Sequence, residues 1–407
     1  MSGWGPMAGS AGSAGSAGSA GSAGSAGSAG SAGSAGSASP IIGLDGVMGM
    51  PGYSGFVPNT MLSHGLTLSR DLLLSGSASN ALKKVDAASF GNANWPSKAS
   101  AGARSMRLQP NVRAMLAEME LMQHVKFGSV PTNAGLGAVV TVGEMPITIY
   151  CPALDPLLLR QTELVLSYAD LRAERTNEIV SQVVPQTAYW SALAGLTPER
   201  HRYTWELLGV GFSFVTKVVM QLKFQLDVPR PGEFSRLVQP MILTPGFQAF
   251  PSGHATEAFF AAEVLSALIE ERKEPALTEL ESLSAKATGL RAQLHRMAYR
   301  IAENRVVAGV HFPIDSIAGE LLGVSLALYF LMRCGAEGFG KLPSSMSALD
   351  PAKKFDARSE PVLDRVLDVD LMGGWEGAKD AMVAGSPVLS KLWTKALQEA
   401  KFSAAGL

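Results

Sequence analysis

The chain has 407 residues, 47% of them hydrophobic, which is enough to bury a sizeable core. Its 34 basic and 35 acidic residues leave a formal charge of −1, which argues against a globally basic, nucleic-acid-binding protein. The two cysteines, Cys151 and Cys334, lack metal-binding spacing, so we predict two free, buried thiols.

The N-terminal part of the sequence differs in composition from the rest. Residues 9–38 repeat Gly-Ser-Ala, which offers no large apolar side chain to offset the entropy of ordering. We therefore predict a low-complexity tail or linker over residues 1–39, an extended irregular arm over 40–109 and a helical domain over 110–407. Residues 1–8 contain no secretory signal pattern, so we expect a cytoplasmic location.

The helical domain begins with a helix predicted over residues 111–125, and the one segment with strand character follows it. Two β-branched runs flank Gly143-Glu144, which predicts a small β-hairpin near residues 136–150. Every later segment has helical periodicity, so we predict an all-α helical bundle. The predicted helices cover residues 155–169, 173–194, 197–226, a stretch from Ser252 onward, 276–303, 313–334, 361–372 and 376–402.

None of these helices is predicted to cross a membrane. A span needs about 20 predominantly apolar residues. The best candidate, Ser316–Met332, contains Glu320. We therefore predict buried core helices and no membrane span.

Three short polar blocks in residues 205–335 are candidates for an active site. The first contains Lys223, Arg230 and Pro231, and on its own a Lys/Arg pair is more often a solvated face. The second, Ser252-Gly253-His254, stands at a predicted helix start, where free N–H groups and the helix dipole favour an anion. Ser252 can serve there as a helix cap or as a donor to a ligand.

The third block contains Arg305, His311 and Asp315. An apolar run from Val306 to Val310 separates the arginine from the histidine and indicates a buried setting, where an arginine is costly without an anionic partner. Asp315 follows His311 by one helical turn and can fix the imidazole tautomer. A plain His/Asp helix pair is the alternative.

Together and in this order, the three blocks resemble the superfamily of type 2 phosphatidic acid phosphatases and vanadium-dependent haloperoxidases. The resemblance implies an oxyanion cradle made by Lys223, Arg230, Ser252, the Gly253 N–H, His254 and Arg305. It also implies that His311 bonds to the central atom, that His254 acts as acid/base, and that Asp315 orients His311.

Two chemistries use such a cradle. The haloperoxidase branch implies a vanadate cofactor bound by His311, with phosphate as a competing occupant, and oxidation of halide by hydrogen peroxide for transfer to a small organic acceptor. The phosphatase branch implies His311 as nucleophile and His254 as general acid. A non-catalytic oxyanion-binding protein is the third alternative.

Several features favour the bacterial haloperoxidase-like branch. The segment Tyr168–Ile179 is similar to one in bacterial haloperoxidase-like proteins, and Phe247 stands where fungal chloroperoxidases place a phenylalanine at the halide site. Asn304 departs from the serine that many members have before the arginine. Haloperoxidases of this type commonly oligomerise, and apolar helix faces such as residues 392–397, predicted to be exposed, are compatible with a homo-oligomer.

Overall fold

In the computed structural model, the structure describes residues 68, 99–132, 135–151, 154–183, 186–270, 289–349, 374–380 and 383–404. The predicted tail (1–39), most of the predicted arm (40–98) and the predicted helix over 361–372 lie outside the described residues. The arm was predicted to stay irregular up to residue 109, but a short helix, α4 (Ala101–Ser105), forms near its end. The Ser100 hydroxyl caps this helix by accepting from the Ala103 N–H.

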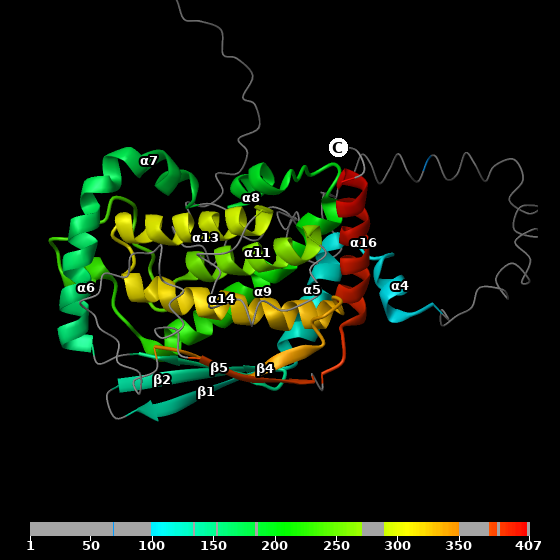
Figure 1. The fold of residues 1–407 in the computed structure, drawn as a ribbon, viewed down its shortest axis with the longest axis horizontal. Coiled ribbons are helices and arrows are strands. Elements are labelled where there is room, and N and C mark those ends of the chain that lie inside the picture. Colours follow the sequence, from blue (N-terminus) through cyan, green and yellow to red (C-terminus); the bar gives the residue numbers. More distant parts are fainter. Residues whose placement is uncertain are drawn as a thin grey trace, which may run out of the picture. The chain divides into compact units, whose positions relative to one another are not determined.

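Helices make up most of the described chain, as predicted (Figure 1). After α4 they are α5 (Pro110–Met122), α6 (Leu154–Tyr168), the 3-10 turn η3 (Ala169–Leu171), α7 (Arg172–Ser181), α8 (Thr187–Ala194), α9 (Arg202–Leu226), α10 (Pro231–Phe234), α11 (Gly253–Ile269), α13 (Gly289–Val307), α14 (Pro313–Cys334) and α16 (Pro387–Ala404).

The core is built around α11 and α14, which pack along each other, with α13 and α9 also against α11 (Figure 1). Every residue of α14 is buried, as expected for a helix that is apolar on all sides. Two glycines let the pair approach closely. A Cβ at Gly319 would lie 2.7 Å from the Ser252 carbonyl oxygen, and one at Gly323 would lie 2.5 Å from that of Thr256.

A mixed sheet lies beside α14 and α9, with strand order β1-β2-β3-β4-β5. The antiparallel pair β2 (Gly135–Val142) and β3 (Met145–Tyr150) confirms the predicted hairpin. The other strands, β1 (Val125–Thr132), β4 (Lys341–Ala348) and β5 (Gly374–Asp380), were not predicted. β5 overturns the helix predicted to begin at residue 376, because this segment pairs with β4 and the helix begins only at Pro387.

Three predicted helices differ in their bounds. Of the helix predicted over 276–303, residues 276–288 lie outside the described residues, and the rest belongs to α13, which extends to Val307. The helix over 173–194 is two helices, α7 and α8, with Pro185 between them in sequence. The helix predicted to start at Thr197 starts at Arg202, because His201 Nδ1 accepts the Thr197 N–H and so closes a separate turn. Glu399 of α16 then accepts the N–H groups of Tyr203 and Thr204 in the first turn of α9.

The apolar face at residues 392–397 was predicted to be exposed, and this was wrong. Leu392, Trp393 and Ala396 are buried, because α16 packs against α9. These residues therefore give no support to self-association. Both cysteines are free and buried, as predicted.

Two described segments, Arg202–Phe234 and Pro313–Cys334, are long and apolar enough to cross a membrane. Their most apolar windows are 67% and 100% buried inside the protein. Burial of this kind is also found in the core helices of soluble proteins, so these segments are weak evidence for a membrane span.

Candidate active site

A pocket opens where the predicted blocks converge. Its empty volume, including space open to solvent, is about 310 Å³, and both polar and apolar residues line it. The polar lining comes from the residue before α10, the start of α11, the last turn of α13 and the loop before α14: Arg230, Gly253, His254, Arg305 and His311. The apolar lining consists of Val183, Ile242, Pro245, Phe247 and Val310.

The two arginines of the pocket have N–H groups with nothing to bind in the described structure. Arg230 donates from Nε to the Phe247 carbonyl (2.9 Å) and from Nη1 to the Val310 carbonyl (2.8 Å), while its buried Nη2 has no partner. Arg305 is held through Nη2, and its Nε and Nη1 are likewise buried without a partner. Orphaned buried donors are costly, so this pattern indicates a site for an oxyanion.

Lys223 is not among the residues that line the pocket. Its ammonium group is fully buried and donates to the carbonyls of Gln248 (2.8 Å) and Ala249 (2.6 Å). The ring of Phe247 lies 5.4 Å from Lys223 Nζ and 5.1 Å from the Arg230 guanidinium. Phe247 is therefore a pocket residue that lies near both cations, and Lys223 adds positive charge beside its ring.

Ser252 was predicted to serve as a helix cap or as a donor to a ligand, and in the structure it is a helix cap. It is the N-cap of α11, with its hydroxyl oxygen accepting the Ala255 N–H, and it does not line the pocket. Its own N–H donates to the Asp315 carbonyl (2.9 Å). This bond connects the start of α11 to the start of α14 and so fixes the position of His254 relative to His311.

His311 and Asp315 form the predicted pair. His311 Nδ1 lies 2.8 Å from Asp315 Oδ2, and Arg230 Nη1 lies 3.1 Å from His311 Nε2. An arginine can only donate, so Nε2 accepts and Nδ1 carries the proton that the carboxylate accepts. The Phe312 N–H donates to the same Asp315 oxygen and fixes the carboxylate. The lone pair of Nε2 therefore points to the arginine side of the pocket.

His254 is fixed from outside the pocket. Its Nε2 lies 2.8 Å from the backbone carbonyl of Gln182, the residue that ends α7. A carbonyl only accepts, so Nε2 carries the proton and Nδ1 is left for the pocket that His254 lines.

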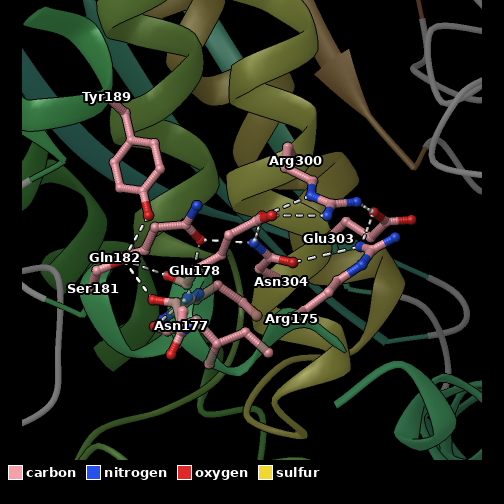
Figure 2. A network of polar contacts seen from close by, with 11 residues as sticks. Arg175, Asn177, Glu178, Ser181, Gln182, Tyr189, Arg300, Glu303 and Asn304 are labelled. Atoms are coloured by element: carbon pink, nitrogen blue, oxygen red, sulfur yellow. Dashed lines mark hydrogen bonds and ion pairs between the residues drawn. The ribbon is translucent and has the colours of Figure 1, made fainter. Parts of the chain in front are cut away.

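The side chain of Gln182 joins a polar network that connects α7 with α13 (Figure 2). Its Oε1 accepts from Arg305 Nη2 (3.2 Å) and from Asn304 Nδ2 (3.0 Å). Asn304 also donates to Glu178 (2.9 Å), whose carboxylate is paired with Arg300. The hydrogen bond from Arg300 lowers the pKa of Glu178 to about 2, so this anchor is charged at neutral pH.

Burial disfavours the charged forms of the ionisable groups at the pocket. Burial lowers the pKa of Arg230 and that of Arg305 to about 10, and lowers the pKa of Lys223 well below its ordinary value. Burial, followed by the nearby arginines, lowers the pKa values of His254 and His311, so both imidazoles are neutral. Burial also raises the pKa of Asp315 to about 7, against the hydrogen bond from Phe312 and the nearby cations. A bound anion would relieve this excess of positive charge.

The structure thus brings the predicted Arg230, Phe247, Gly253, His254, Arg305 and His311 to the pocket, with Asp315 directly behind His311. It places Lys223 and Ser252 outside the lining. Sequence reasoning missed Gln182, because its contacts to His254 and Arg305 span more than 70 residues of chain. The only signal was indirect, since the Tyr168–Ile179 segment was singled out and ends three residues earlier.

Comparison with known proteins agrees with this geometry. Residues 203–336 match the family model of the PAP2 superfamily, a range that holds every predicted site residue. No curated protein matches the chain.

Proposed function

We propose that this chain, whose residues 203–336 match the PAP2 superfamily, is a vanadate-dependent haloperoxidase. The match supports the chemistry of phosphatases and haloperoxidases in general. In the proposed reaction hydrogen peroxide oxidises a halide ion by two electrons. One peroxide oxygen enters hypohalous acid, the other leaves as water, and the hypohalous species then halogenates a small organic acceptor.

The residues of the pocket fit vanadate as a cofactor. The orphaned N–H groups of Arg230 and Arg305 and the amide of Gly253 at the start of α11 would bind its oxygens, and the Nε2 lone pair of His311 would bind the metal. Lys223 would stabilise the anion by its charge. Bound vanadate would supply Lewis-acid activation that makes peroxide oxygen electrophilic toward halide.

The protein's own groups divide the remaining tasks. Asp315 accepts the Nδ1 proton of His311 and thereby keeps Nε2 unprotonated, and a ligand atom that bonds to Nε2 would replace its contact with Arg230 Nη1. His254, neutral in the described structure and held through Nε2, can accept a proton from hydrogen peroxide at Nδ1 and return it to the departing oxygen. The apolar side of the pocket restricts water.

The observation that carries the haloperoxidase proposal is the position of Phe247. Its ring lines the pocket while lying within 5.4 Å of Lys223 Nζ and 5.1 Å of Arg230. An apolar ring beside two cations suits a halide, which is a large and weakly hydrated anion. The Phe247 ring offers a phosphate ester no additional hydrogen-bond donor.

The His311–Asp315 pair favours acid phosphatase activity as the second candidate, because it is also what a nucleophilic histidine requires. His311 Nε2 would bond to phosphorus as the ester P–O bond breaks, and protonated His254 would give its proton to the leaving oxygen. Water would then hydrolyse the phosphohistidine, with His254 accepting a proton from that water.

One pair of assays on a single preparation separates the candidates. A haloperoxidase should brominate a phenolic dye with peroxide only after vanadate is added, and excess phosphate should suppress the reaction. A phosphatase should hydrolyse p-nitrophenyl phosphate and be inhibited by vanadate. A non-catalytic protein should do neither, and in each case His311→Ala is the inactive control.

A further inference from the structure

Gln182 is the α7 residue that contacts both the proposed acid/base and one cation of the cradle. It is fully buried, its backbone carbonyl accepts from His254 Nε2 at 2.8 Å, and its side-chain Oε1 accepts from Arg305 Nη2 at 3.2 Å. Arg305 Nη2 also donates to the Ile179 carbonyl (2.9 Å). The last turn of α7 therefore fixes one side of each group.

The orientation of the Gln182 carboxamide follows from its partners (Figure 2). Arg305 only donates, so the Gln182 atom that faces it is oxygen. The Asn304 atom that faces the same oxygen must then be nitrogen, and this nitrogen also donates to the Glu178 carboxylate. Glu178, Asn304 and Gln182 thus form a series of hydrogen bonds that ends at Arg305, and each bond in it pairs a donor with an acceptor, while the Gln182 Nε2 has no partner among the described residues.

The series also keeps negative charge away from Arg305. The one carboxylate in this series of hydrogen bonds belongs to Glu178. It is paired with Arg300, and the neutral carboxamides of Asn304 and Gln182 separate it from Arg305. The described partners of Arg230, Arg305 and Lys223 are carbonyls, a carboxamide and an imidazole. Nearby carboxylates act on the charges of Arg230 and Lys223 without bonding to their side chains, whereas no described carboxylate acts on Arg305, whose charge is left for a ligand.

We propose that Gln182 is a positioning residue that orients Arg305 and His254 while its neutral carboxamide leaves the charge of Arg305 to the bound oxyanion. This rests on the oxyanion site of the proposed function, and it names the residue that tunes that site's affinity. A glutamate at this position would keep the shape and both acceptor contacts, but it would pair with Arg305 and compete with the ligand.

The test compares Gln182→Glu with Gln182→Met and with the control Asn177→Asp, an amide-to-acid change on the exposed side of the same helix. Binding of inorganic phosphate and of orthovanadate is measured by calorimetry between pH 5 and 8. At pH 8 we expect Gln182→Glu to weaken binding about 10- to 100-fold, with the loss shrinking as the pH falls and the introduced carboxyl is protonated. Gln182→Met should weaken binding by an amount that stays constant with pH, and the control should match wild type.

A purely structural role would give equal losses for both Gln182 variants at every pH, and this would overturn the proposal. Wild-type affinity in Gln182→Glu at pH 8 would overturn it as well. If Gln182→Glu does not fold, the Met variant still decides, because unchanged affinity there would contradict the orienting role. Binding is measured without turnover, so failure of the halogenation assay would refute the proposed function and leave this result standing.

Discussion

Gly319 links helix packing to the geometry of the pocket, and substituting it tests that link. In Gly319→Ala the new Cβ would lie 2.7 Å from the Ser252 carbonyl oxygen and 2.8 Å from the Ala255 Cβ. Neither atom belongs to a flexible side-chain end, so α11 and α14 must separate by roughly half an ångström. We expect about 1–3 kcal/mol of strain, partly offset by about 1 kcal/mol from the better helix propensity of alanine.

The effect on activity should be larger than the effect on stability. The separation shifts the Ser252–His254 turn relative to His311 and weakens the 2.9 Å bond from Ser252 N–H to the Asp315 carbonyl. Displacements of this size cost on the order of 10- to 100-fold in rate. Steady-state kinetics and thermal unfolding of Gly319→Ala should be compared with Gly340→Ala, where a Cβ meets nothing within 4 Å. Full activity in Gly319→Ala would refute the claim that this contact sets the site.

Three further predictions concern charge. Asp315→Asn should leave the fold intact but reduce turnover by about 10²- to 10⁴-fold, because the tautomer of His311 is no longer fixed; near-wild-type turnover would argue against the pair. Burial raises the pKa of Glu320 to about 8, so the folded carboxyl holds a proton that the unfolded chain has lost, and this group alone contributes a slope of falling stability as pH rises from 4.5 toward 8. Glu320→Gln should remove this slope, worth a few kcal/mol, in melting temperatures measured across that range, and an unchanged slope would contradict the assignment. The pKa values of His254 and His311 in the folded protein lie below 6.5, so as pH falls these histidines bind protons in the unfolded chain before they do so in the folded one. The two histidines should therefore lower the stability of the ligand-free protein as pH falls through 6.5. Phosphate should offset that loss, and melting curves unaffected by phosphate at pH 5–6 would count against the site.

Local signals in the sequence predicted the parts of the fold that depend on local structure. The bounds of α14 match the prediction at both ends, because Pro313 stands at the first helical position and Gly335 adopts the left-handed conformation just past the end. The hairpin around Gly143 was also predicted correctly. Strand β4 was missed because it pairs in parallel with β3, almost 200 residues away in sequence, and such pairing has no local signature.

In the candidate site too, local sequence signals predicted some features, and the features that depend on distant contacts were missed. The types and order of Arg230, His254, Arg305 and His311 were sufficient to predict that they meet. The distinct place of Lys223, beside the ring of Phe247, was not predictable, because it depends on which carbonyls the loop at Gln248 offers. The role of Asn304 was likewise hidden, since its partners Glu178 and Gln182 come from another helix.

The central claim, that His311 anchors an oxyanion between Arg230 and Arg305, is tested most directly by calorimetric titration of orthovanadate into wild type and His311→Ala. We predict one site per chain in wild type, displaced by phosphate, with affinity lowered at least 100-fold in the variant. Equal affinity in both proteins would contradict the account.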